Sequence, residues 1–316
     1  MDFVKYPKIG QYRNVVKEVS DYCEYHNEEL PTITFHGTVK LHGTNAGISF
    51  DPSTNELQAQ SRNRVITPES DNAGFAFFVE SNKEELIEWF KSQHFDEVVT
   101  VFGEWCGGNI QKGVALSQLS KMFVVFDIKV GDYYYLPYEV VLVDMPLNVK
   151  SVYDFPTYSV DVDFSNPEGC VGTLQEITVG VEEECPVGKF FGVSGVGEGV
   201  VWKSSGTMPR QVFKVKGEKH SVTKVKKLTS SSVENMEGIK EFVQYALTEQ
   251  RLLQGIGEVF GDQTPDISNL GDFIKWVKGD IFSEEMDTLI SSGIEPKHVV
   301  KSLSSETVKW FKTQYC

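Results

Sequence analysis

The sequence predicts an α+β fold, in which an antiparallel-sheet domain is followed by a small all-helical domain. From residue 32 to about residue 227 the chain consists mainly of short runs of β-branched and aromatic residues separated by glycine, a pattern typical of strands and turns. After residue 228 the apolar residues instead recur at the spacing of an α-helix. We therefore expect two domains, 1–227 and 228–316, which agrees with the size at which single cores stop growing.

The first domain contains stretches that predict strands and two that predict helices. Helical periodicity is found at residues 12–22 and at residues 84–90, where apolar residues alternate with charges. Short strands with few helices indicate antiparallel sheet. The strands are expected at 32–39, 46–50, 98–105, 122–130, 133–143 and 199–203.

The second domain follows a Thr-Ser-Ser-Ser stretch at residues 229–232, which we interpret as a linker. Apolar residues at helical spacing from Ile239 to Ile256 predict one helix, and residues 273–277 predict a second. Ser283 is the right residue type to cap a third helix that stops before Gly293, and Pro296 can open a fourth.

Charge is unevenly distributed along the chain. The formal net charge is −15, which taken alone argues against a polyanionic partner. Residues 201–227, however, contain eight basic side chains and one acidic side chain, directly after a strongly acidic stretch. Because salt screens exposed charges beyond about 8 Å, a distant acidic face does not prevent this basic segment from binding phosphates. A merely solvated lysine-rich face is the alternative.

Other features of the composition favour an intracellular, cytoplasmic protein. The five cysteines are an odd number without a CxxC pair, so we expect reduced thiols. The longest apolar runs are far shorter than the ~20 residues that cross a bilayer, and the first residues lack the apolar core of a signal peptide. We therefore expect no membrane partner and, for a viral protein, the host cytoplasm.

The segment from Lys40 to Asn45, KLHGTN, carries the most informative residue pattern. It lies between two predicted strands, and the glycine behind the lysine favours a turn that presents the amine to a cleft. The following Thr44 and Asn45 can contact a sugar or a phosphate. A lysine before a glycine turn is also typical of an ordinary loop, so the motifs that follow decide between the two interpretations.

Five further motifs follow in order, and together with the lysine motif they resemble the ATP-dependent RNA ligases. The resemblance is to the family typified by a phage enzyme that seals nicks in double-stranded RNA and by RNA-editing ligases, within the covalent nucleotidyltransferase superfamily. It covers residues 40–216, and the helical tail resembles the family's C-terminal domain. The five motifs are Ser61-Arg62-Asn63-Arg64, Phe102-Gly103-Glu104-Trp105, Val125-Phe126-Asp127-Ile128, Glu198-Gly199-Val200-Val201-Trp202-Lys203 and Phe213-Lys214-Val215-Lys216.

The resemblance implies a fold, a reaction and a set of site residues. It implies an ATP-grasp-like nucleotidyltransferase domain that uses ATP to join RNA 5′-phosphate and 3′-hydroxyl ends, bridged on a complementary strand, through lysyl-AMP and RNA-adenylate. Lys40 is then the nucleophile, and Glu198 is a ligand of Mg²⁺ or Mn²⁺. Glu104 accepts a hydrogen bond from the ribose, and Phe126 stacks on adenine. The other implied catalytic or ATP-binding residues are Leu41, His42, Asn45, Arg62, Lys203, Lys214 and Lys216.

The chemistry of the first step places a demand on Lys40. Attack on phosphorus requires a neutral amine, which costs about 4.6 kcal/mol at pH 7 for an ordinary lysine. Lys214 and Lys216 are two residues apart in an alternating strand pattern, so both amines project from one face. We expect these cations to lower the pKa of Lys40 and to hold the α-phosphate oxygens as charge accumulates.

Departures from the family pattern leave alternatives open. Val39 precedes the nucleophile where the phage enzyme has an acidic residue, and His42 stands where the wider superfamily has aspartate. A DNA ligase or capping-type nucleotidyltransferase resembles the same core but carries an OB barrel after the paired lysines, where this chain is predicted to be helical. A catalytically inactive nucleic-acid-binding relative is the third interpretation. We expect a monomer whose helical domain helps to engage RNA.

Overall fold

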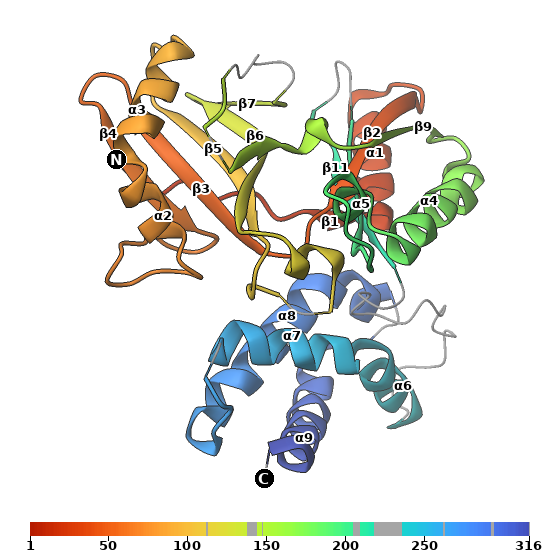
Figure 1. Ribbon diagram of the computed structural model, residues 1–316. Coiled ribbons are helices and arrows are strands. Elements are labelled where there is room, and N and C mark those ends of the chain that lie inside the picture. The colour runs from red at the N-terminus through yellow and green to blue at the C-terminus, as the bar shows by residue number, and fades with distance from the viewer. Residues whose placement is uncertain are drawn as a thin grey trace. The chain divides into compact units, whose positions relative to one another are not determined.

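The computed structural model divides into two compact units, Met1–Gly217 and Glu218–Cys316. The first unit carries two β-sheets with flanking helices, and the described part of the second is helical (Figure 1). The expected domain boundary between residues 227 and 228 lies outside the described residues. The structure describes residues 1–111, 113–137, 144–146, 148–204, 209–217, 236–261, 263–291 and 294–315.

Five of the described strands form the first sheet, in the order β1-β11-β10-β2-β9. Neighbouring strands are antiparallel except β1 and β11, which are parallel. The expected strands at 32–39 and 199–203 are confirmed, whereas β9 was not expected, because Asp161 and Asp163 are among its exposed positions. The strands are Gly10–Gln11 (β1), Thr32–Lys40 (β2), Thr157–Asp163 (β9), Gly199–Ser204 (β10) and Val212–Lys216 (β11).

The second sheet has the order β4-β3-β5-β6-β7, and β8 pairs in parallel with β6. It confirms the expected strands at 46–50, 98–105 and 122–130. Of the strand expected at 133–143, the first three residues form β7, and residues 138–143 lie outside the described part of the chain. The strands are Thr44–Asp51 (β3), Glu56–Ser61 (β4), Val99–Cys106 (β5), Met122–Val130 (β6), Tyr133–Tyr135 (β7) and Val149–Ser151 (β8).

Each sheet buries one face under helices. Helices α1 (Tyr12–His26) and α4 (Val171–Glu183) share a core with apolar side chains of the first sheet. Helices α2 (Phe75–Ser81) and α3 (Lys83–Ser92) do the same for the second sheet. The opposite faces carry the polar residues of the motifs. The shorter helical elements of this unit are α5 (Pro186–Phe190), η1 (Ala115–Gln118), η2 (Val152–Asp154) and η3 (Pro167–Cys170).

Helices α1 and α3 confirm the expected periodicity, but α2 and α4 were not expected. The sequence of α4 includes Gly172 and Gly180 and several β-branched residues, which lowers its intrinsic helix propensity. Burial of Leu174 and Val181 against the sheet outweighs that preference. The short helix α2 begins where the carboxylate of Asp71 accepts backbone hydrogen bonds from Ala76 and Phe77.

The second unit corrects two expectations about helix boundaries. The helix expected from 239 to 256 is interrupted, because Thr248 caps a new helix by accepting a 3.3 Å hydrogen bond from the Arg251 N–H. Ser283 starts no helix and lies inside one, because the buried Phe273, Val277, Ile281 and Leu289 form one continuous stripe. The expected start at Pro296 is confirmed. The described α-helices of this unit are α6 (Met236–Ala246), α7 (Glu249–Phe260), α8 (Leu270–Ser291) and α9 (Pro296–Tyr315), with a 3₁₀ turn η4 (Ile267–Asn269).

Candidate active site

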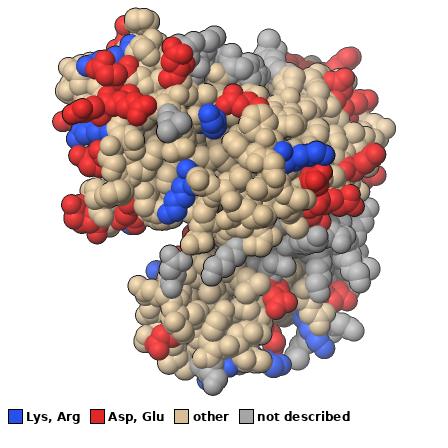
Figure 2. Space-filling model, in the orientation of Figure 1, with Lys and Arg blue, Asp and Glu red and all other residues tan. Residues whose placement is uncertain are grey.

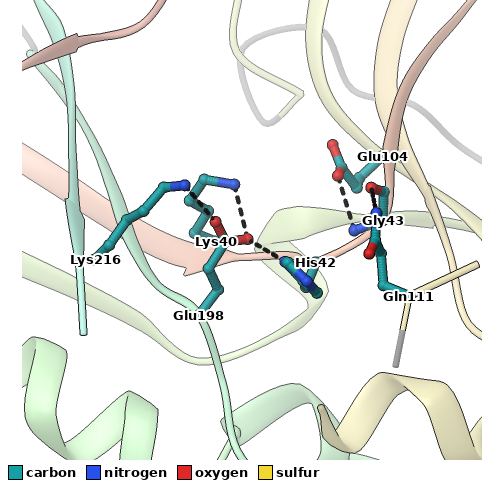
Figure 3. A network of polar contacts seen from close by, with 7 residues as sticks. All are labelled: Lys40, His42, Gly43, Glu104, Gln111, Glu198 and Lys216. Atoms are coloured by element: carbon teal, nitrogen blue, oxygen red, sulfur yellow. Dashed lines mark hydrogen bonds and ion pairs between the residues drawn. The ribbon is translucent and has the colours of Figure 1, made fainter. Parts of the chain in front are cut away.

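The first sheet brings two lysines to the same carboxylate. Lys40 ends β2 and Lys216 ends β11, and both are in register with Gly199 at the start of the intervening strand β10. Glu198 precedes β10, with its Oε2 2.9 Å from the Lys40 amine and its Oε1 3.0 Å from the Lys216 amine (Figure 3). Predicted site residues from three distant motifs therefore meet at one point.

The glycine after Glu198 makes this arrangement possible. Gly199 has a φ of +151°, and a Cβ at this position would lie 2.2 Å from the carbonyl oxygen of Val215 in β11. Any other residue would force β10 and β11 apart at this end. Gly199 therefore keeps both lysine strands within reach of one carboxylate.

The side chains of Leu41 and His42, which follow β2, lie in different surroundings. The Nδ1 of His42 lies 3.0 Å from Glu198 Oε2, the oxygen that also binds the Lys40 amine. Leu41 is 5% exposed and packs in the core behind the sheet. Of the two predicted residues, only His42 therefore contributes its side chain to the polar cluster.

The shared carboxylate determines the charge of Lys40. Burial by itself lowers the pKa of this lysine, but the negative charges of Glu198 and Glu104 outweigh burial and raise its pKa. Burial likewise opposes the charge of Glu198, yet Lys40 and Lys216 hold its pKa well below the usual range. The expectation that the paired lysines lower the pKa of Lys40 is therefore wrong, because the anionic Glu198 lies between Lys40 and Lys216.

Glu104 of the second sheet holds the loop that follows Lys40. Its Oε1 accepts a 3.0 Å hydrogen bond from the Gly43 N–H, and the Gln111 side chain donates to the Gly43 carbonyl at 3.4 Å (Figure 3). Burial raises the pKa of Glu104 to about 7, although Lys40 acts in the opposite direction. Glu104 therefore changes its protonation state near neutral pH.

Three further predicted residues surround this centre. The Oδ1 atom of Asn45 is buried without a hydrogen-bond partner in the described structure, as expected of an atom whose partner is a bound molecule. Arg62 is exposed directly after β4, and its charge lowers the pKa values of both Lys40 and Glu104. Lys214 is half-buried and lies two residues before Lys216, on the same face of β11.

Phe126 and Lys203 are in contact at the junction of the two sheets. Phe126 is the half-buried position within an otherwise buried stretch of β6. The Lys203 amine lies 5.5 Å from the Phe126 ring centroid, donates to the Phe126 carbonyl at 2.6 Å and pairs with Asp127 at 3.1 Å. Lys203 is only 1% exposed, and its amine ties β10 to β6.

Sequence reasoning missed the side chains that complete this junction. The Tyr6 hydroxyl donates to Asp127 Oδ2, and the Arg210 guanidinium pairs with Asp127 Oδ1. An aspartate in the apolar stretch from Met122 to Val130 is a signal for a buried ion pair, since buried charges are paired. Nothing in the local sequence, however, links Asp127 to Tyr6, which lies 121 positions away.

On the face that Figure 2 shows, the acidic side chains of the first unit gather in two areas. Figure 2 shows them mainly at the left, where Figure 1 places α3, and at the right, where it places α4. The surface between them is largely uncharged, with isolated basic side chains. On this face, the acidic side chains are therefore concentrated in two areas that largely uncharged surface separates.

The sequence matches the model of the RNA ligase family over residues 33–216, more than half of the chain. No curated protein matches it. Within the described residues, the helices are too short or too polar to span a membrane.

Several solved structures are similar to the chain. One is a Naegleria gruberi RNA ligase variant with ATP and Mn, at 19% identity and a TM-score of 0.47, over 68% of this chain and 57% of that one. Another is the RNA ligase of the same organism with pyrophosphate, at 20% identity and a TM-score of 0.47, over 68% and 56%. An archaeal ATP-dependent RNA ligase follows at 13% identity and a TM-score of 0.44, over 96% and 65%. The chain thus spans less than two thirds of each of these proteins. Because the matched family region contains every motif from Lys40 to Lys216, the chain belongs to the RNA ligase family.

Proposed function

We propose that the protein is an ATP-dependent RNA ligase that joins RNA 5′-phosphate and 3′-hydroxyl ends at nicks in duplex RNA, through lysyl-AMP and RNA-adenylate. The observation that carries this proposal is the meeting of Lys40, Lys216 and Glu198 within the matched region. These side chains supply a nucleophile, a cation for phosphate oxygens and a carboxylate for a metal. The choice of ATP as the nucleotide rests on the motif resemblance.

In the proposed first step, the Lys40 amine attacks the α-phosphate of ATP, a P–N bond forms and pyrophosphate leaves. The amine must first lose the proton that Glu198 stabilises. Glu198 Oε2 accepts from the Lys40 amine, so we assign this carboxylate as the first acceptor of that proton, while His42 Nδ1 donates to the same oxygen and orients it. Lys214, Lys216 and Arg62 then hold the phosphate oxygens as negative charge accumulates.

Glu198 fits a divalent cation, Mg²⁺ or Mn²⁺, of the kind that takes few ligands from protein. The described residues contain no group of three or more His, Cys, Asp or Glu side chains that could hold a metal. Magnesium typically binds one or two carboxylates and completes its shell with water and substrate phosphates. When bound, such a cation would neutralise charge on the triphosphate and compete with Lys40 for the carboxylate.

We assign the adenosine to the junction between the sheets. Phe126 stacks on adenine, and Glu104 accepts a hydrogen bond from a ribose hydroxyl. Asn45 supplies its buried Oδ1 to the nucleotide, and Leu41 can contribute only its backbone. Lys203 acts on the nucleotide indirectly, by holding the Phe126 carbonyl.

In the later steps, AMP passes from Lys40 to the RNA 5′-phosphate, and the RNA 3′-hydroxyl then displaces AMP. We propose that the helical unit helps to bind the RNA and that the enzyme acts as a monomer inside the cell. The described cysteines support this location, because Cys23, Cys106, Cys170 and Cys185 are free thiols.

Labelling with ATP that carries a radioactive α-phosphate tests the proposal. With Mg²⁺, the wild type should retain covalent label, and Lys40→Ala should retain none. Lys189→Ala should match the wild type, because that lysine is exposed and pairs with Glu184, which belongs to no motif. Persistent label on Lys40→Ala would reject the nucleophile. A second assay compares the sealing of nicks whose 3′-hydroxyl strand is RNA with the sealing of nicks whose 3′-hydroxyl strand is DNA, which separates an RNA ligase from a DNA ligase. Labelling of the protein without any sealing of nicks would favour a capping-type enzyme. The absence of both labelling and sealing would favour an inactive relative.

A further inference from the structure

The N-terminal segment runs across both sheets of the first unit. At one end, the Gln60 side chain of β4 donates to the Val4 carbonyl at 2.6 Å, and its oxygen accepts from the Val4 N–H at 3.3 Å. At the other end, Gly10–Gln11 forms β1 and pairs with β11, the strand of the paired lysines. Figure 1 shows the N-terminus beside β4 and β1 in the other sheet. Residues 1–11 therefore connect the two halves of the site.

Tyr6 lies in the middle of this segment and is 4% exposed. Its ring centroid is 5.1 Å from that of Phe102 and 5.1 Å from that of Phe126, which it meets edge-on at 64°. Edge-to-face packing of this kind is favourable and fixes the orientation of both rings. Tyr6 therefore restrains the aromatic ring that we assign to adenine.

The Tyr6 hydroxyl also completes the buried charge cluster at the junction. Asp127 is fully buried and accepts this hydroxyl on Oδ2, while Lys203 and Arg210 pair with Oδ1. Burial first, and the charge of Asp127 second, raise the pKa of Tyr6 well above its ordinary value, so the phenol stays a hydrogen-bond donor. Without the phenol, one buried carboxylate oxygen would lose its partner, which loosens the link from Lys203 to the Phe126 carbonyl.

We infer that Tyr6 is a positioning residue for the adenine end of ATP, acting through Phe126 and Asp127. The inference rests on the proposed function and extends it, because Tyr6 lies outside the matched region and outside every motif from Lys40 to Lys216. Tyr6 contacts Phe126 and Asp127, which we place beside the adenine of ATP, whereas we place Glu198 and Lys216 beside its phosphates. Its removal should therefore weaken binding of ligands that contain adenine and spare pyrophosphate.

Two substitutions separate the contributions of the ring and the hydroxyl. Tyr6→Phe keeps the ring contact with Phe126, and Tyr6→Leu removes both. The rate of lysyl-AMP formation is measured against ATP concentration, and the reverse reaction, in which pyrophosphate and lysyl-AMP regenerate ATP, against pyrophosphate concentration. We expect the KM for ATP to rise about threefold to tenfold in Tyr6→Phe and more in Tyr6→Leu, with kcat within about twofold. The KM for pyrophosphate should stay at the wild-type value.

Tyr12→Phe is the matched control. It removes a hydroxyl whose partners are the Pro167 carbonyl at 2.7 Å and Cys170 Sγ at 3.1 Å, and it should change neither KM. An unchanged KM for ATP in Tyr6→Phe would overturn the inference, as would a parallel rise of both KM values together with a lower melting temperature. If Tyr6→Leu fails to fold, Tyr6→Phe decides alone. A wild type that forms no lysyl-AMP would refute the proposed function instead.

Discussion

Lys40 and Lys216 bind opposite oxygens of one carboxylate, that of Glu198, at 2.9 and 3.0 Å. Although burial lowers the pKa of Lys40, the negative charges of Glu198 and Glu104 together outweigh burial and the charge of Arg62, so this pKa is raised. If Lys40 is the nucleophile as we propose, its activation depends on weakening its ion pair with Glu198.

The pH dependence of lysyl-AMP formation should reveal this ion pair. The wild-type rate should rise with pH, because Lys40 is protonated below its raised pKa and only the neutral amine attacks. Glu198→Gln removes the largest effect that raises this pKa, so the midpoint should move toward lower pH, while the maximal rate falls. The check is the pH–rate profile of both proteins at saturating ATP, with the exposed Glu184→Gln as control. A midpoint at the same or a higher pH would contradict the assignment.

Glu104 should make the stability of the chain depend on pH. Its pKa is about 7 in the folded chain and 4.5 as an ordinary glutamate, so the folded state binds the proton more tightly. This contribution to stability is full below the ordinary value and is lost as pH rises through about 7. We expect the free energy of unfolding to fall by about 1 to 3 kcal/mol from this group. Urea denaturation at pH 5 and pH 8 should show a smaller difference for Glu104→Gln than for the wild type, and an equal difference would refute the prediction.

The buried pair of Lys203 and Asp127 should be worth far more than an exposed pair of similar length. Lys203→Met leaves the fully buried Asp127 with one cation fewer, which should cost about 3 kcal/mol or more of the free energy of unfolding. Lys189→Met breaks the exposed 3.0 Å pair with Glu184 and should cost about 0.5 kcal/mol or less. Denaturant titration of the two variants measures the contrast, and comparable losses would argue against it.

Gly43 should tolerate no side chain. A Cβ at this position would lie 2.3 Å from the Trp105 carbonyl oxygen and 2.7 Å from Cys106 Cβ, so the loop after Lys40 would have to move. We expect Gly43→Ala to lower the rate of lysyl-AMP formation about 100-fold, because small displacements of reacting groups have effects of that size. Gly172→Ala lies in helix α4 with nothing within 4 Å of the added Cβ and should keep the wild-type rate. Equal rates for the two variants would show that the loop can adjust.

The helical unit should be needed for sealing RNA and not for the reaction of Lys40 with ATP. Removal of residues 229–316 should leave Lys40 labelling within about twofold, because every residue of the polar cluster lies in Met1–Gly217. Sealing of nicked duplex RNA should be strongly impaired. Gel assays of labelling and of sealing on the same preparations separate the two effects. Loss of both activities together would indicate that the unit only stabilises the chain.

The sequence predicted a strand correctly where its residues both favour a strand by type and are buried in the folded protein. The strand expected at residues 122–130 coincides with Met122–Val130, because β-branched and aromatic residues there pack against both cores. Helix α4 could not be predicted locally, because its glycines disfavour a helix that only packing of Leu174 and Val181 stabilises. Ser283 illustrates the converse, since a good capping residue is overridden when the flanking apolar stripe is continuous.

Motif order predicted that Lys40, Glu198 and Lys216 lie close together but not how their charges combine. The alternation of Lys214 and Lys216 correctly placed them on one face of β11. Sequence spacing could not show that Glu198 lies between Lys40 and Lys216, because that depends on strand register. The contact of Tyr6 with Asp127 depends on a segment that crosses two sheets, and such long-range pairing leaves no local signal.

The identity of the adenylylated residue tests the central claim most directly. The wild type is incubated with ATP and Mg²⁺, digested, and the peptides are analysed by tandem mass spectrometry for the added mass of AMP. We predict that AMP is attached to the Lys40 amine through a phosphoramidate (P–N) bond. AMP on Lys216, Lys214 or any other side chain, or no adduct at all in a chain shown to bind ATP, would contradict the account.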